Sequence, residues 1–150
     1  MNVLRIVAPG NESMLEQWRH VHNTIIPTHL LSLDDVRDRS RRHHLEVAYL
    51  GEALVGCSTV RPPTDESPAA TVIARVLADY RGHGIGTTLY TRGLARAREL
   101  GAEIIETVVL SSNPEGLRFA RRQGFVELER YVLPGETTPW IDLRLEPQNQ

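Results

Sequence analysis

The sequence predicts one domain of the α/β (α+β) class, with about seven strands and about four helices. Its 150 residues, 41% of them hydrophobic, are enough for one buried core. Short apolar runs alternate with segments whose apolar residues recur at helical intervals, in the order β-α-α-β-β-β-α-β-α-β-β. No repeat, low-complexity stretch or linker interrupts this order, so we expect residues 1–150 to form a single domain.

The first part of the chain predicts a strand and two helices. An apolar run at residues 3–8 predicts the strand. Helical spacing predicts a helix over residues 12–24, where Ser13-Met14-Leu15-Glu16 has the pattern of a capping box. A second capping signal at residues 32–35 precedes a charged helix over residues 36–42.

The rest of the chain supplies six strands and two helices. The strands are apolar runs, expected at residues 45–50, 53–61, 71–78, 104–110, 125–133 and 138–145. Gly51-Glu52 is a two-residue connection, which predicts that the second and third strands form a hairpin. The two helices are expected at residues 84–100, where Gly101 ends the helix, and at residues 114–123.

Composition excludes several classes of protein. With 17 basic and 19 acidic residues the net charge is −2, so no basic field is present and nucleic acid is not an expected partner. No run of about 18 apolar residues and no signal peptide is found, so we expect no membrane partner and a cytoplasmic location. The single cysteine, Cys57, lies in an apolar run and is expected to be a packed thiol. No metal is expected, because His43 and His44 are adjacent and would point to opposite faces of a strand.

The run Arg81-Gly82-His83-Gly84-Ile85-Gly86 carries the most functional information. It follows a predicted strand and opens a predicted helix, so its backbone N–H groups and the helix N-terminus can together hold a pyrophosphate. The spacing differs from the dinucleotide pattern G-x-G-x-x-G, and a Walker loop is excluded because the chain has no lysine. The alternative is a glycine-rich turn that only joins the strand to the helix.

Two blocks of sequence resemble the GNAT superfamily of N-acetyltransferases. Arg81-x-x-Gly84-x-Gly86 resembles its coenzyme A motif, and a second block combines Ser111-Ser112-Asn113-Pro114 with Gln123-Gly124-Phe125. The resemblance implies a mixed sheet that splays between its fourth and fifth strands, with the pantetheine arm of acetyl-CoA in the gap. The coenzyme-binding residues it implies are Val76, Leu77, Ala78, Arg81, Gly82, His83, Gly84, Ile85, Gly86, Thr87, Thr88, Asn113 and Phe119.

The implied activity is transfer of an acetyl group from acetyl-CoA to a primary amine of a small acceptor, by direct attack in a ternary complex. A homodimer is left open. The family often places a tyrosine seven residues after the asparagine as the general acid, but this chain has Ala120 there. Ala120 therefore keeps open a second interpretation, a coenzyme A-binding sensor or interaction module without turnover. A phosphotransferase has little support, because the P-loop lysine and a paired carboxylate motif are absent.

The sequence does not single out one residue as the general base or as the contact for the acceptor. Five side chains could approach the amine, and a structural role would also explain each of them: Glu46, Tyr49, Ser111, Ser112 and His29. His29 lies in a segment between the first two helices that we expect to act as a lid. Arg75 is charged within an otherwise apolar central strand, so it needs a partner or an exposed face. It is expected either to bind an acidic group of the acceptor or to form a salt bridge to a neighbouring strand.

Overall fold

The computed structural model describes residues 3–147 and contains a mixed sheet of seven strands in the order β1-β2-β3-β4-β5-β7-β6. The strands are β1 (Leu4–Val7), β2 (His44–Leu50), β3 (Ala53–Arg61), β4 (Ala69–Val76), β5 (Ile104–Leu110), β6 (Phe125–Tyr131) and β7 (Trp140–Leu145). The helices are α1 (Glu12–Ile25), α2 (Leu33–Arg42), α3 (Ile85–Glu99) and α4 (Pro114–Arg122), with a short 3₁₀ turn over Ala78–Tyr80. The predicted class and element order are confirmed.

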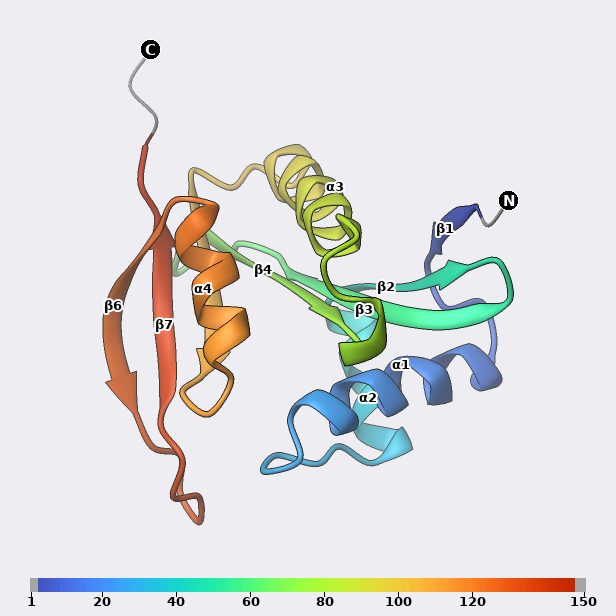
Figure 1. Ribbon diagram of the computed structural model, residues 1–150. Helices are drawn as coiled ribbons and strands as arrows, with labels where there is room; N and C mark the ends of the chain where they lie inside the picture. Colours follow the sequence, from blue (N-terminus) through green and yellow to red (C-terminus); the bar gives the residue numbers. More distant parts are fainter. Residues whose placement is uncertain (1–2, 148–150) are drawn as a thin grey trace.

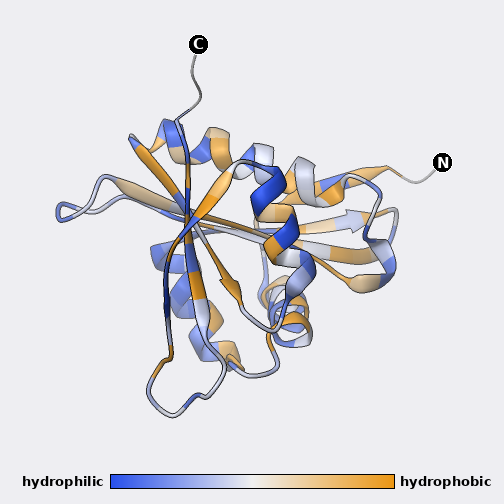
Figure 2. Cartoon of the chain, turned by 60° about the vertical axis from the view of Figure 1, so that its left-hand side comes forward, coloured by the Kyte–Doolittle hydropathy of each residue, from blue (hydrophilic) through white to orange (hydrophobic). Residues whose placement is uncertain are grey.

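The helices cover both faces of the sheet (Figure 1). On one face α1 and α2 pack through Trp18, Val21 and Val36 against residues of β2 and β3 such as Val47. On the other face α3 and α4 meet at Tyr90 and Phe119, whose rings lie edge to face with centroids 6.3 Å apart. Apolar residues gather on the strands between these two layers, whereas much of the helix surface is hydrophilic (Figure 2).

The sheet opens between β4 and β5. These two strands are parallel, and they pair only over three residues of each, Ala69 to Thr71 with Ile104 to Glu106. Beyond that point β4 continues antiparallel to β3 as far as Val76, while β5 pairs with β7. The carboxyl ends of β4 and β5 therefore diverge, which confirms the splay that the family resemblance implied.

Several element boundaries differ from the predicted ones. The N-cap of α1 is Asn11, not Ser13: Asn11 has an extended backbone and its side chain accepts the N–H of Met14, which leaves Ser13 inside the first turn. The second capping signal is confirmed, since Ser32 and Asp35 form a reciprocal capping box, but helix α2 begins at Leu33.

Strand β4 also ends earlier than predicted. It stops at Val76, two residues before the expected end at Ala78, because Ala78–Tyr80 turns into the 3₁₀ helix. Because β4 ends there, the chain turns away from the sheet immediately before the glycine-rich run. Two other strands are also shorter than predicted: β6 ends at Tyr131, and β7 begins at Trp140.

Candidate active site

A cavity of about 350 Å³ occupies the gap between the diverging ends of β4 and β5. Gly84 and Gly86, at the start of α3, line it together with Phe119 of α4. Ile26, at the end of α1, and Arg75 of β4 line it on the face covered by α1 and α2. The cavity therefore connects the two faces of the sheet, and molecules entering from opposite sides can meet in it.

The glycine-rich run presents free backbone donors at one end of this cavity. Gly82 and Gly84 have φ values of +83° and +80°, a conformation that favours glycine, and a Cβ at either position would meet nothing within 4 Å. Gly84 is the N-cap of α3 and supplies no side-chain cap. Within residues 3–147, the N–H groups of residues 82–87 have no hydrogen-bond acceptor. Such a row of unpaired donors at a helix N-terminus fits an anion.

Arg81 spans the gap beside these donors. Its Nε donates to the carbonyl oxygen of Val76 at 3.1 Å, and its Nη1 forms an ion pair with Glu115 in the first turn of α4. The side chain thus connects the end of β4 to the helix that follows β5. Its charge is directed to Glu115 and is not left free beside the glycines.

The end of β4 directs one backbone N–H into the gap. The N–H of Leu77 donates to the carbonyl oxygen of Val55 on β3, at 2.8 Å. Successive N–H groups of a strand point to alternate sides, so the N–H of Val76 points away from β3. It lies beyond the last pair of β4 with β5 and therefore faces the cavity.

Most of the residues predicted to bind the coenzyme line this cavity. Those on its wall are Val76, Arg81, Gly82, Gly84, Ile85, Gly86, Thr87, Asn113 and Phe119, and those outside it are Leu77, Ala78, His83 and Thr88. Asn113 also has a structural task, because it is the N-cap of α4 and its Oδ1 accepts the N–H of Gly116 at 3.1 Å. His83 is exposed.

Two candidates for the general base lie away from the cavity. Glu46 of β2 is 7% exposed and accepts two hydrogen bonds from Arg92 of α3, at 3.1 Å and 2.7 Å. Tyr49 is buried between β2 and α1, and its hydroxyl donates to Gln17 Oε1 at 2.5 Å. Both groups are held by protein partners, and neither lines the cavity.

The other candidates lie nearer its rim. Ser111 and Ser112 follow β5 directly, next to Asn113 on the cavity wall. The Nδ1 of His29 lies 2.5 Å from Glu136 Oε2, and its ring meets Trp140 edge to face at 5.9 Å. The side chains of Ser111, Ser112 and His29 do not form part of the wall.

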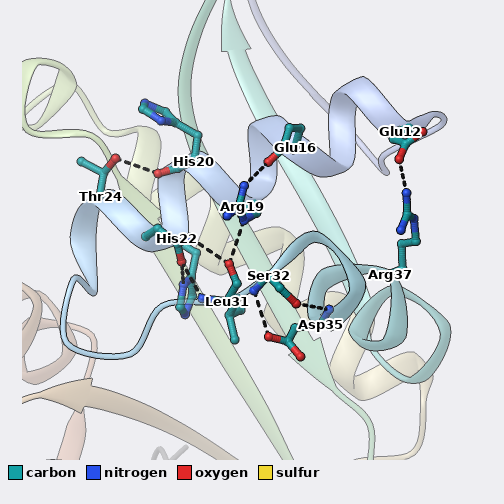
Figure 3. Close-up of polar contacts among 11 residues, drawn as sticks. Glu12, Glu16, Arg19, His20, His22, Thr24, Leu31, Ser32, Asp35 and Arg37 are labelled. Atoms are coloured by element: carbon teal, nitrogen blue, oxygen red, sulfur yellow. Dashed lines mark hydrogen bonds and ion pairs between the residues drawn. The ribbon is translucent and has the colours of Figure 1, made fainter.

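The segment expected to act as a lid is fixed at several points. The carbonyl oxygen of Leu31 accepts Arg19 Nε at 2.7 Å and Asn23 Nδ2 at 3.0 Å, both from α1. Ser32 then begins α2 through its capping box with Asp35 (Figure 3). Movement of residues 26–32 therefore requires that several of these bonds break.

Ala120 and Tyr90 both line the α3–α4 side of the cavity. Ala120 is 3% exposed and lines the wall, so a larger side chain there would project into the cavity or into the core. Tyr90 lines the same wall, and burial raises the pKa of its hydroxyl. Tyr90 is not among the residues predicted from the sequence, although its position four residues after Gly86 places it on the same face of a helix.

Arg75 and Cys57 lie opposite each other on β4 and β3. Burial lowers the pKa of Arg75 to about 10, so the group stays charged at neutral pH, and it forms no ion pair within residues 3–147. The predicted alternative, a salt bridge to a neighbouring strand, is therefore wrong for the described chain. Cys57 is fully buried, which raises the pKa of its thiol to about 12 and makes it a poor nucleophile at neutral pH.

The described part of the chain offers no group of three or more His, Cys, Asp or Glu side chains arranged to hold a metal ion. Among residues 3–147, no helix is long and apolar enough to cross a membrane.

The model of the acetyltransferase (GNAT) family matches residues 11–125. A search of curated proteins found no match.

Solved structures share the whole fold. A putative acetyltransferase from Salmonella typhimurium, with its cofactor acetyl-CoA, superposes with a TM-score of 0.76 at 15% identity, covering 99% of this chain and 96% of that one. A ribosomal-protein-alanine N-acetyltransferase from Brucella melitensis gives 0.73 at 20% identity, covering 95% and 98%. An acetyltransferase from Thermus thermophilus gives 0.66 at 26% identity, covering 97% and 100%.

Proposed function

Because the chain belongs to the GNAT family of acetyltransferases and is an acetyl-CoA-dependent enzyme, we propose that it acetylates a primary amine of a small acceptor by direct attack in a ternary complex. Acetyl-CoA is the co-substrate. It supplies an acetyl thioester, whose carbonyl carbon is the electrophile.

One observation supports the proposal above all others, namely the row of N–H groups at residues 82–87, which have no acceptor within residues 3–147 and which, except at His83, belong to residues of the cavity wall. The donor set fits a diphosphate: it is positive, it consists of backbone, and Gly82 and Gly84 leave room for close approach. We assign the pyrophosphate of the co-substrate to these donors. Phe119 and Gly86 would then border the chain that leads from the pyrophosphate into the gap.

We assign to the N–H of Val76 the role of polarising the thioester carbonyl. It faces the cavity and needs no rearrangement, because Leu77 is anchored to β3 through Val55. A fixed donor that stabilises the developing negative charge on a carbonyl oxygen contributes about 3 kcal/mol to lowering the barrier in other enzymes. The backbone of β4 is therefore the main catalytic device that we assign to this chain.

The acceptor approaches from the face covered by α1 and α2. In the transfer, the amine nitrogen forms a bond to the acetyl carbon and gives up one proton to water. The bond from that carbon to sulfur breaks with its electron pair going to sulfur, and the thiolate then takes up a proton from water. No side chain at position 120 can donate this proton, but a thiol is acidic enough to leave without it. The thiol of Cys57 does not accept the acetyl group, because it is buried and its pKa is about 12.

The test is consumption of acetyl-CoA, followed as release of free thiol, with a panel of primary amines that spans small molecules and short peptides. We expect turnover with at least one small amine and tight binding of coenzyme A in calorimetry. Tight binding without turnover on any amine would instead support the sensor or interaction module, which Ala120 favours. Turnover with peptide N-termini alone would contradict the small acceptor.

A further inference from the structure

Three arginine side chains differ from all others in the described chain. Most arginines that form no ion pair within residues 3–147 are exposed to solvent. The ones that are neither exposed nor ion-paired are Arg39, Arg61 and Arg75. The Nε of Arg61 is buried and has no hydrogen-bond partner in the described part of the chain. A cation withdrawn from water without a partner is costly, so the arrangement calls for an anion that the protein itself does not supply.

The three side chains converge on one face of the sheet. Arg75 pairs with Cys57, and Arg61 pairs with Thr71, so alternation along β3 and β4 places both arginines on the same face as Cys57. That is the face covered by α1 and α2. Arg39 follows the buried Val36 by one turn of α2 and therefore points toward the same layer. Arg75 reaches the cavity wall beside Ile25 and Ile26.

The charges in this layer reinforce one another. Burial lowers the pKa of Arg75, and the positive charges of Arg61 and Arg39 lower it further. The same surroundings lower the pKa of His22 to about 3, through burial first and then through Arg75, so His22 is neutral and contributes no additional cation. The floor of this side of the cavity is therefore positive at neutral pH.

The neighbouring carboxylates are already engaged. Asp142 attracts Arg61 but accepts a hydrogen bond from the hydroxyl of Tyr131 at 2.9 Å. Asp35 attracts Arg39 but is held in the capping box by Ser32. Among the charges that shift the pKa of Arg75, none is a carboxylate. Arg75 is thus the cation with the least internal compensation, and it is the one that lines the cavity.

We propose that the acceptor is an amine that also carries an oxyanion, a carboxylate or a phosphate-type group, and that this oxyanion binds Arg75 within the positive field of Arg61 and Arg39. The inference rests on the proposed function and deepens it. Arg75 on β4 lies one residue before Val76, whose N–H faces the gap, so an acceptor anchored at Arg75 holds its amine close to the reacting carbonyl. The guanidinium fork matches both kinds of oxyanion.

The experiment compares acids with matched neutral analogues. α-Amino acids, ω-amino acids and aminoalkylphosphonates are each paired with an amide or ester in which the negative charge is lost. For every pair, kcat/KM is measured with acetyl-CoA, and the dissociation constant is measured by calorimetry on protein saturated with coenzyme A. The same measurements are made on Arg75→Gln, Arg75→Lys and Arg41→Gln, of which the last removes an exposed arginine of the same helix as Arg39.

We expect the wild-type protein to prefer the acid of at least one pair by about tenfold or more, as a charge-assisted hydrogen bond allows. Arg75→Gln should abolish this preference, Arg75→Lys should keep part of it, and Arg41→Gln should keep all of it. Comparison of the carboxylate and phosphonate arms identifies the oxyanion. Since Arg75 forms no ion pair within residues 3–147, Arg75→Gln should melt no lower than wild type, whereas loss of a structural ion pair would lower Tm.

Other results would overturn the inference, and they can be told apart from failure of the proposed function. Equal turnover of acids and neutral analogues would support acetyl transfer and contradict the oxyanion. A preference that survives in Arg75→Gln would contradict the assignment of Arg75. If no amine is acetylated, acetyl transfer to small amines fails, and calorimetry still decides the oxyanion by the difference between acid and analogue.

Discussion

His29 and Glu136 join two loops that are 107 residues apart in sequence, with Nδ1 and Oε2 separated by 2.5 Å. Glu136 also accepts the indole N–H of Trp140 at 2.9 Å, and both hydrogen bonds hold the pKa of its carboxyl below the usual range. The turn between β6 and β7 is thereby fastened to the segment between α1 and α2. These two segments border the side of the sheet from which we expect the acceptor to enter.

Removal of this connection should weaken acceptor binding. Glu136→Ala deletes the acceptor of both hydrogen bonds, so we expect the acceptor KM to rise roughly fivefold, the effect of losing one ordinary hydrogen bond, and Tm to fall. The KM for acetyl-CoA should change less. Glu129→Ala, which removes an exposed carboxylate of the same hairpin, is the matched control. Equal effects of the two variants on acceptor KM would show that the connection has no part in acceptor binding.

Blocking the glycine-rich run should weaken coenzyme binding. Gly84→Val places a branched side chain at a φ of +80° among the free N–H groups, so calorimetry should give a dissociation constant for coenzyme A at least about tenfold higher, because hydrogen bonds to charged groups are lost. Gly101→Val carries the same backbone strain, at a φ of +87°, at the other end of α3. It should lower stability without changing affinity. His83→Ala should bind normally, because His83 is exposed. Unchanged affinity in folded Gly84→Val would disprove the pyrophosphate assignment.

Introducing a phenol at position 120 tests how the thiolate leaves. Ala120 lines the cavity, so Ala120→Tyr can place a hydroxyl near the sulfur and raise kcat, by less than the roughly 10²-fold low end of general-acid catalysis because the new group is not aligned. Ala120→Phe fills the same volume without a proton to donate. A rise in kcat for the tyrosine variant alone would identify proton donation. Equal kcat values for the two variants would show that the introduced phenol donates no proton to the thiolate.

The buried His22 should make the fold sensitive to acid. Its pKa is about 3 in the folded protein, through burial and the charge of Arg75, against 6.5 for a free histidine. The unfolded chain therefore binds one more proton than the folded chain between these values, and stability falls as pH falls from 6.5 toward 3. The loss is about 1.4 kcal/mol per pH unit below that upper limit.

Denaturant unfolding at pH 7.5 and pH 5 measures this effect on stability as roughly 2 kcal/mol for His22. His22→Gln should reduce the difference, whereas His20→Gln, at an exposed position of the same helix, should not (Figure 3). His43, whose pKa is lowered to about 4 mainly by burial, acts in the same direction, so part of the pH dependence should remain in His22→Gln. A pH dependence that is identical in wild type and His22→Gln would contradict this account.

Sequence patterns predicted local structure well and non-local pairing poorly. The hairpin at Gly51 and the helix that ends before Gly101 follow from residues close together in the chain, and both are found as predicted. The position of β7 between β5 and β6 does not follow from any local pattern, because it depends on which strand edge is free after the others have paired. Asn11 displaced Ser13 as the cap of α1 because two capping residues lie within one turn and only one has the extended backbone.

The candidate site was likewise predicted best where its residues are consecutive in the sequence. The glycine-rich run was recognisable because it is continuous in sequence, and most of the residues predicted with it line the cavity. The catalytic candidates depended on side-chain direction, which the sequence does not give: Glu46 is held by Arg92 of α3, and Tyr49 by Gln17 of α1. The assignment of individual residues to the coenzyme and to the amine stays a prediction that the variants above test.

Strand β7 has a consequence for how the protein is made. Among the described strands, β7 (Trp140–Leu145) leaves the ribosome last, yet it pairs with β5 on one side and β6 on the other. Until it emerges, β5 and β6 each present an open edge, the kind of surface on which nascent chains aggregate. The half of the sheet beyond the gap is therefore finished only after β7 has emerged, and a chain cut short before Trp140 would retain the glycine-rich run but lack the strand that pairs with both β5 and β6.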